Sequence, residues 1–220
     1  MRTIKTKKHR QAYSQKKEEI IRAAEKRFIR HGLQKTTVDE IARDLRIGKA
    51  TLYHYFKTKE ELFRETVLWQ SEEYLRQINS LFINENISSV EQVSAYLELK
   101  RDFGTKFKLL DYVVKSFLND SHLPGETEYV VSLLKKEGEI IKVALATWLP
   151  KEQEINLELL ANTIVILGFT LETADKIFPK LFPENEGKMT ETRNYLDLLL
   201  RSIILDPPRN LLKYELPSTI

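Results

Sequence analysis

Residues 37–62 read TVDEIARDLRIGKATLYHYFKTKEEL, and this stretch decides the fold because two short helical patterns flank a tight turn. It opens with a capping box. The Thr37 hydroxyl accepts the amide of the third helical residue, and Glu40 accepts the Thr37 amide. Apolar residues then recur at helical spacing as far as Leu45. The pattern predicts a first helix that ends at a turn around Arg46 and Gly48.

A second helix is predicted from Lys49 to about Phe56. Leu52 and Phe56 are four residues apart and therefore share one face, which is expected to lie inside. The remaining positions carry long donors, methyl groups and a phenol: Lys49, Ala50, Thr51, Tyr53 and His54. Two short helices joined by a tight turn, the second with a basic and aromatic outer face, are typical of the helix-turn-helix that reads a DNA major groove.

Residues 49–63, KATLYHYFKTKEELF, resemble the signature of TetR-type transcriptional regulators. That signature places a basic and a small residue before Thr-Leu-Tyr-x-His/Tyr-Phe, followed by a short polar residue, Lys and two acids. The resemblance covers residues 14–65. Arg46 stands where this family usually has Gly, so a positive φ there would cost about 1 kcal/mol. Gly48 replaces a common Ser or Thr, and no phosphate contact from a hydroxyl can be inferred at that position.

The outer face of the second helix has the chemistry to read bases. Lys49 can donate to guanine O6 and N7, Ala50 and Thr51 can meet a thymine methyl or a base edge, and His54 can do either. Other side chains suit phosphate contacts, namely Thr37, Tyr53, Tyr55, Lys57 and Lys59. The resemblance implies the same roles at these positions. Two alternatives stay open: the Tyr55 ring packs against the first helix with only its hydroxyl exposed, and His54 is a solvated surface residue.

Charge is distributed unevenly along the 220 residues. Residues 1–60 hold 17 Lys and Arg against 7 Asp and Glu, a net charge of +10, whereas residues 61–220 carry −7. The basic part coincides with the helix-turn-helix, and cationic side chains that displace phosphate counterions give affinity for any duplex. The chain has no cysteine, and its longest apolar run, residues 159–171, is too short to span a bilayer. We therefore expect a cytoplasmic protein without a membrane segment.

No alternating strand pattern occurs, so the predicted class is all-α. Residues 1–13 are expected to form a flexible basic arm that touches DNA, or else a solvated tail. Residues 14–58 form the predicted DNA-binding domain, residues 59–205 a helical body for ligand binding and dimerisation, and residues 206–220 a tail. The helix over residues 59–82 starts in the first domain and ends in the body, which makes it the expected lever between them.

Two late helices, residues 157–178 and 191–205, are apolar on more than one face and therefore need a second partner. A two-fold pairing with the same helices of a second copy is the expected arrangement. The alternative is burial of both faces within one monomer. The predicted dimer interface comprises Leu160, Ile164, Leu167, Leu171, Leu196, Leu199 and Ile203.

The resemblance also implies a cavity for a small-molecule effector, of unknown identity, among the middle helices. Candidate lining residues are aromatic, although each also suits a plain core: Tyr96, Phe103, Phe107, Tyr112, Phe117, Tyr129 and Trp148. No histidine has a partner at metal-ligand spacing, and no catalytic motif stands out, so neither an enzyme nor a cofactor is expected. The favoured function is a ligand-responsive repressor, homodimeric on double-stranded DNA. A DNA-binding protein without a switch, such as a nucleoid or division factor, is the alternative.

Overall fold

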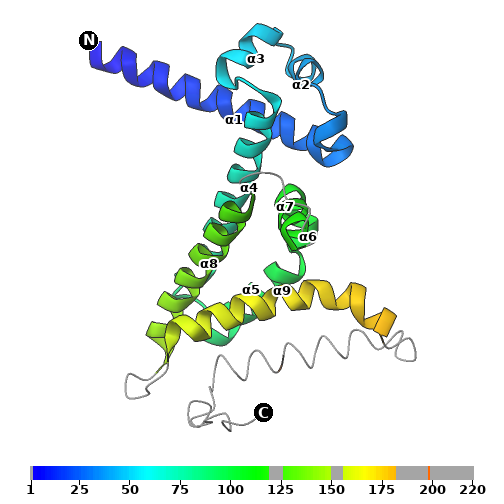
Figure 1. Ribbon diagram of the computed structural model, residues 1–220. Helices are drawn as coiled ribbons and strands as arrows, with labels where there is room; N and C mark the ends of the chain where they lie inside the picture. The colour runs from blue at the N-terminus through cyan, green and yellow to red at the C-terminus, as the bar shows by residue number, and fades with distance from the viewer. Residues whose placement is uncertain (1, 119–125, 150–155, 182–197, 199–220) are drawn as a thin grey trace. The chain divides into compact units, whose positions relative to one another are not determined.

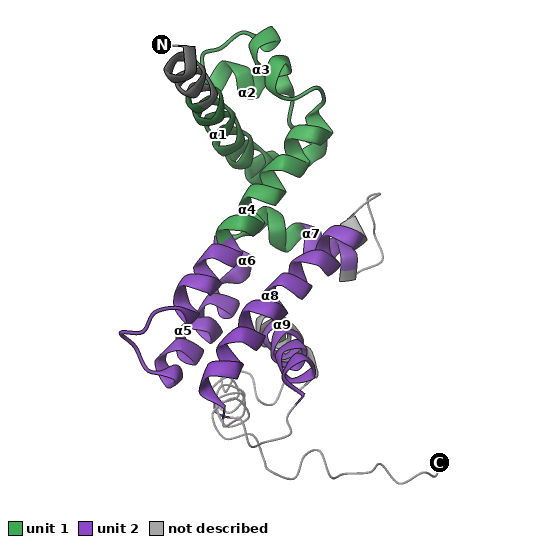
Figure 2. Ribbon diagram, turned by 90° about the vertical axis from the view of Figure 1, so that its left-hand side faces the viewer, with its two compact units in different colours: residues 1–73, 107–112 green, residues 74–106, 113–220 purple. Residues whose placement is uncertain are grey.

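The computed structural model describes residues 2–118, 126–149, 156–181 and 198, and every regular element within them is a helix (Figure 1). The all-α prediction is confirmed. The chain divides into two compact units, residues 1–73 with 107–112, and residues 74–106 with 113–220 (Figure 2). The division falls inside a helix and not at residue 58, because the first half of that helix packs with the helices before it. The predicted domain boundaries stay predictions.

Helix α1, Arg2–Lys35, begins earlier than expected. The flexible arm predicted for residues 1–13 is wrong for residues 2–13, because the lysines, arginines, glutamine and alanine there are good helix formers and no breaker precedes Gly32. At Gly32 the backbone takes φ 74°, which only glycine adopts without strain, and this interrupts the helix near its C-terminal end. Ile20, Ala24 and Phe28 form the buried stripe of α1.

Three further helices follow in the first unit: α2 (Val38–Asp44), α3 (Lys49–Tyr55) and the start of α4 (Lys59–Phe82). The predicted bounds of α4 are confirmed. Thr58 caps it, since the Thr58 hydroxyl accepts the Glu61 amide at 3.0 Å. Thr58 and Glu61 have the spacing of a capping box, but the Glu61 carboxylate accepts the Lys57 amide, at 2.7 Å.

The second unit contains α5 (Ser89–Arg101), α6 (Phe103–Lys106), part of α7 (Lys108–Leu118), α8 (Glu126–Trp148) and α9 (Leu157–Leu181). Ser88 and Glu91 form a capping box at the start of α5. The short helix α6 is separate from α7. Helix α9 continues past Pro179, where a helix end was expected; a proline so close to the end costs few backbone hydrogen bonds. Helix α9 packs along α8 and α5.

The start of α7 is capped by a residue distant in sequence. Gln70 of α4 is buried, and its side-chain oxygen accepts the amides of Leu109 and Leu110 at 3.1 and 3.0 Å. Its amide nitrogen donates to Glu25 of α1 at 2.6 Å. The first amides of a helix have no partner within that helix, so Gln70 satisfies two of them and joins three helices of the first unit.

Candidate nucleic-acid interface

The helix pair α2–α3 is built as the sequence predicts. Thr37 accepts the Glu40 amide at 3.3 Å, while the Glu40 carboxylate accepts the Thr37 amide at 3.0 Å, which completes the capping box. The Thr37 amide and hydroxyl both donate to the Glu40 carboxylate, which lowers the pKa of Glu40 because its charged form is favoured. Leu52 and Phe56 are fully buried on the inner side of α3.

Arg46 adopts a φ of 52°, so the positive backbone angle considered for this turn is present. A residue other than glycine loses on the order of 1 kcal/mol there. The turn is held by backbone bonds, since the Arg46 amide donates to the Arg43 carbonyl at 3.0 Å and the Ile47 amide to the Ala42 carbonyl at 3.0 Å. Gly48 precedes α3 and offers no side-chain cap. The first turn of α3 therefore keeps amides available to an outside acceptor.

The outer face of α3 is exposed along its length. Tyr53, predicted to contact phosphate, is 42% exposed, and the predicted base readers are exposed with it: Lys49, Ala50, Thr51 and His54. The division between an apolar inner side and a basic, aromatic outer side is thus confirmed. Contact of these side chains with DNA stays a prediction.

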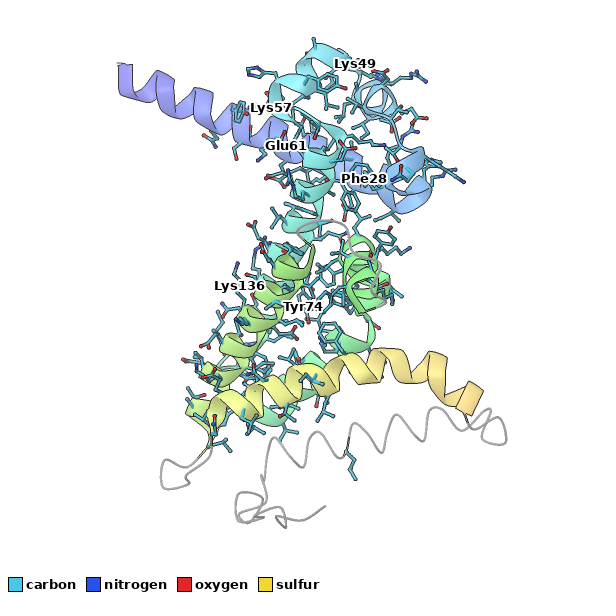
Figure 3. The ribbon with its side chains drawn as sticks, in the orientation of Figure 1. Phe28, Lys49, Lys57, Glu61, Tyr74 and Lys136 are labelled. Atoms are coloured by element: carbon cyan, nitrogen blue, oxygen red, sulfur yellow. The ribbon has the colours of Figure 1, made fainter. Side chains whose placement is uncertain are left out.

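Lys49 has an acidic neighbour that sequence reasoning missed. Its ammonium lies 2.9 Å from the Asp39 carboxylate of α2, and 6.0 Å from the Tyr53 ring centroid (Figure 3). The hydrogen bond and the charge of Asp39 raise the pKa of Lys49, so the amine stays cationic at neutral pH. Both partners are exposed, and such a pair is weak enough to open for a stronger acceptor. Asp39 therefore orients Lys49 in the absence of DNA.

Tyr55 shows the packing that was kept open as an alternative. Its ring is half-buried and stacks on Tyr13 of α1, with centroids 4.7 Å apart and planes at 28°. His54 meets both rings edge to face, at 6.2 Å from Tyr13 and 5.5 Å from Tyr55. Tyr13 was missed by sequence reasoning because it was assigned to an arm. It orients two residues of the α3 face.

The two lysines at the start of α4 differ in their surroundings. Lys57 is exposed, whereas Lys59 is half-buried and its ammonium donates to the Leu33 carbonyl at 2.9 Å. An ammonium has three donors, so Lys59 keeps two for a phosphate, but the Leu33 contact also gives it a structural role. Thr37 lies exposed at the start of α2, with its hydroxyl also donating to Glu40 at 2.9 Å.

Helix α1 is joined to the pair by charge-assisted contacts. Arg27 makes a two-pronged bond with Asp44, at 2.6 and 2.8 Å, and lies 3.5 Å from Glu40. Lys17 lies 2.6 Å from Glu65 and 5.5 Å from the Phe56 ring centroid. Bidentate pairs of this kind are geometrically specific, so they set the angle of α1 against α2.

Acid should weaken the contact between Arg27 and Asp44. The hydrogen bond from Arg27 lowers the pKa of Asp44 below its ordinary value of 3.8, so its contribution to stability is present above pH 3.8 and is lost as pH falls further. We expect the wild-type melting temperature to fall more steeply between pH 5 and 3 than that of Asp44→Asn, as followed by circular dichroism. Equal slopes for the two proteins would show that this pair does not contribute.

The aromatic residues expected around an effector cavity are dispersed. Tyr96 and Phe103 are buried in the second unit, while Phe107 and Tyr112 belong to the first. Tyr112 is 54% exposed, so its assignment to a pocket is wrong: the buried side of α7 is formed by its neighbours in the helix, not by this position. The remaining three are half-buried in the second unit: Phe117, Tyr129 and Trp148.

A buried ion pair lies at the centre of the second unit. The Lys100 ammonium of α5 is 3.2 Å from a Glu137 oxygen of α8, and Tyr74 and Tyr96 donate to the same oxygen at 2.8 Å each. We call these four residues the Lys100 cluster; Figure 3 labels Tyr74 on α4. The Lys100 ammonium also lies 3.3 Å from the Phe169 ring centroid. Burial, followed by the Glu137 charge, raises the pKa of Tyr96 well above its ordinary value.

The residues predicted to form the dimer interface differ in their exposure. Ile164 is buried within the chain, so its assignment to an interface is wrong, whereas Leu160 and Leu167 are half-buried. The apolar side chains that α9 exposes are Leu159, at 59%, and Ile166, at 64%. The rest of the predicted set lies outside the residues whose side chains are described: Leu171, Leu196, Leu199 and Ile203.

The described part of the chain contains neither a metal-type cluster nor a helix that could span a membrane. No cluster of three or more His, Cys, Asp or Glu residues there has the arrangement of a metal site. Within the same residues, none of the helices has both the length and the apolar character needed to cross a membrane.

A helix-turn-helix with an exposed basic and aromatic second helix defines the class of DNA-binding regulatory proteins. Residues 20–66 match the family model described as "Bacterial regulatory proteins, tetR family". The N-terminal part of the chain is therefore similar to the DNA-binding part of TetR-type transcriptional regulators.

Similarity to individual proteins extends over only part of the chain. The chain is 46% identical over 50 residues to an uncharacterised HTH-type transcriptional regulator, YhgD, of Bacillus subtilis, covering 23% of this chain and 26% of that one. It is 27% identical over 110 residues to the biofilm operon negative transcriptional regulator IcaR of Staphylococcus aureus, covering 50% and 56%. These matches therefore span about a quarter and about half of the two relatives.

The fold as a whole resembles solved structures at low identity. The crystal structure of the transcriptional regulator FadR from Bacillus subtilis in complex with stearoyl-CoA aligns with a TM-score of 0.58 at 16% identity, covering 86% of this chain and 98% of that one. An identity this low supports the shared fold alone.

Proposed function

We propose that this protein is a cytoplasmic, ligand-responsive repressor that binds a pseudo-palindromic operator as a homodimer. The single observation that carries the proposal is the outer face of α3. Lys49, Thr51 and His54 are exposed there, while Leu52 and Phe56 hold the helix to the unit from within. An α-helix that presents such a face fits the width of the major groove, and these side chains match base-edge donors, acceptors and methyl groups.

Charge supports the same role. The net charge of +10 over residues 1–60 supplies attraction to phosphates irrespective of sequence. Lys57 and Tyr53 are exposed beside the reading face, where they suit the contacts that set register on the backbone. Binding should therefore weaken steeply as salt rises. The Asp39 carboxylate next to Lys49 carries the same sign of charge as the DNA phosphates and is repelled by them. Asp39 therefore disfavours binding at sites where Lys49 gains no base contact.

A homodimer is supported by apolar surface on the second unit. Leu159 and Ile166 of α9 are both more than half exposed, on a helix whose other side is buried against α8. Apolar side chains that a chain leaves on one helix suit a self-complementary, two-fold interface. Two recognition helices related by that axis would enter successive major grooves about 34–36 Å apart.

An effector would act by preferring one spacing of the two heads. It can shift that equilibrium only by its difference in affinity between the DNA-competent and the DNA-released states. Helix α4 belongs to both units, and Gln70 of α4 also holds the start of α7, so a tilt of α4 is the movement we expect to change head spacing. The stearoyl-CoA complex of the FadR structure shows that a protein of this fold accommodates a small-molecule ligand.

The experiment that tests the proposal is selection of bound duplexes from random DNA by the purified full-length chain. We expect enrichment of an inverted repeat whose half-sites are one helical turn apart, or a small multiple of it. Light scattering of the same protein, with and without the selected duplex, gives the stoichiometry. Enrichment of single, unrepeated sites bound by a monomer would contradict the operator and dimer proposals, and no enrichment would contradict sequence-specific binding.

Lys49→Ala is expected to cost ~1–3 kcal/mol of discrimination at one base pair of each half-site, because the ammonium loses its guanine contact. Lys57→Ala is the matched control, since a phosphate contact weakens all sequences about equally and lowers the salt slope by about one. Both are measured by fluorescence anisotropy on the selected duplex and its single-base variants. If Lys49→Ala weakens every duplex equally, its base-reading role is wrong.

A further inference from the structure

The turn between α2 and α3 contains an arginine with a strained backbone. Arg46 has a φ of 52°, a left-handed conformation that glycine adopts freely and other residues adopt only at a cost. The turn itself is held by main-chain hydrogen bonds, from the Arg46 amide to the Arg43 carbonyl and from the Ile47 amide to the Ala42 carbonyl. Glycine at position 46 could form the same bonds without the strain. The shape of the turn therefore gives no reason for an arginine.

The side chain of Arg46 does not offset this strain within the protein. It is exposed, and within the part of the chain that the structure describes its guanidinium makes no hydrogen bond and no ion pair. The acids at the two ends of α2 are already paired, since Asp39 lies 2.9 Å from Lys49 and Asp44 lies 2.6 Å from Arg27. Backbone strain that the fold does not need is found mainly at functional sites.

The place of Arg46 in the helix pair suits a contact with DNA. In a helix-turn-helix the first helix crosses the DNA backbone, while the first residues of the second helix reach the base edges. Arg46 lies between the two, three residues before Lys49, which Figure 3 labels. It also has the only polar side chain of residues 46–48, because Ile47 is apolar and Gly48 has no side chain. A guanidinium presents a planar set of donors that matches the oxygens of a phosphate.

We infer that Arg46 is a DNA-binding residue whose guanidinium donates to a phosphate beside the base pair that Lys49 reads. The contact fixes the register of α3 along the backbone, so Arg46 positions the helix while Lys49 discriminates between bases. This inference rests on the proposed function, because it requires α3 to lie in the major groove. The strain at Arg46 is then offset only in the complex. Loss of Arg46 should consequently weaken DNA binding without weakening the fold.

Arg46→Asn tests both parts of this expectation, because asparagine tolerates the left-handed conformation but has no charge. Without DNA, its melting temperature should equal that of the wild type or exceed it by up to about 4 °C. In fluorescence anisotropy it should bind the selected duplex and an unrelated duplex more weakly by a similar factor, roughly tenfold. The salt dependence of log K should become shallower by about one for each DNA-binding head.

Two further variants separate a phosphate contact from a general effect of charge. Arg64→Gln removes one positive charge from an exposed position of α4 in the same unit, outside the helix pair, and should leave the salt dependence unchanged. Arg46→Lys keeps the cation and loses the planar fork, so it should keep the wild-type salt dependence and part of the affinity. If Arg64→Gln changes the salt dependence as much as Arg46→Asn, or if Arg46→Lys behaves like Arg46→Asn, the inference is overturned.

The remaining outcomes distinguish this inference from the proposed function. Arg46 makes no contact if Arg46→Asn binds both duplexes as the wild type does. It is structural if that variant melts more than about 4 °C below the wild type, and it reads a base if discrimination is lost at a single base pair; each result overturns the phosphate contact alone. A wild type that binds an unrelated duplex but selects no site contradicts the operator, and the salt dependences still decide the role of Arg46. A wild type that binds no duplex at low salt contradicts both.

Discussion

Lys100→Met is expected to lower the free energy of unfolding by about 3–5 kcal/mol. The Lys100 and Glu137 side chains are at most 1% exposed, and their charged atoms are 3.2 Å apart. Removal of the ammonium leaves a buried carboxylate with only two tyrosine hydroxyls as donors, and one of its oxygens already has no hydrogen-bond partner. Denaturant unfolding followed by circular dichroism measures the loss.

The control for this prediction is a variant that combines Lys100→Met with Glu137→Leu. Replacing both members of a buried pair by apolar residues of similar size is often neutral, so most of the stability should return. This variant also carries Tyr74→Phe and Tyr96→Phe, because these two hydroxyls would otherwise lose their Glu137 acceptor at a cost of roughly 1–3 kcal/mol each. If the combined variant is as unstable as Lys100→Met, the loss comes from packing around the lysine stem and not from the unpaired charge.

Phe56→Ala is expected to lower the stability of the first unit by about 3–5 kcal/mol and to abolish DNA binding. Its ring is fully buried at the end of α3, with the Lys17 ammonium 5.5 Å from the ring centroid. Without the ring, one of the two residues that hold the inner side of α3 is lost, and the outer face loses its fixed orientation. Thermal unfolding and anisotropy on the selected duplex report the two effects.

Tyr53→Ala in the same helix is the matched control. Tyr53 is exposed, so its removal should change stability by no more than about 0.5 kcal/mol. It should nevertheless weaken duplex binding, because a phosphate contact is lost. A variant Phe56→Ala that keeps full duplex affinity would contradict the inward orientation of α3, on which the reading face depends.

Several features of the fold follow from residues close together in the sequence. The Thr37 and Ser88 capping boxes join residues three apart, and the spacing of Leu52 and Phe56 assigns the two sides of α3. The turn at Arg46 is also local, because it depends on the positive φ of that one residue. Each of these contacts depends on local geometry, which the order of residues determines without knowledge of the rest of the chain.

Other features were not predictable because they join distant residues. Lys100 and Glu137 are 37 residues apart, and neither helix pattern indicates that the two side chains meet. A Cβ at Gly168 of α9 would lie 2.8 Å from the Lys100 side chain of α5. The need for glycine at this position therefore depends on how closely these two helices approach. Gln70 appears as an ordinary polar residue of α4 until α7 is placed beside it.

The order of amino acids by itself determined the helical class, the helix-turn-helix and the residues that face outward from α3. Periodicity, capping and turn propensity act over a few residues, and they are enough for that part. Only the tertiary structure decided that Lys49 is held by Asp39 and that Tyr13 stacks on Tyr55. Those contacts arise when helices pack, and packing depends on the shapes of many side chains at once.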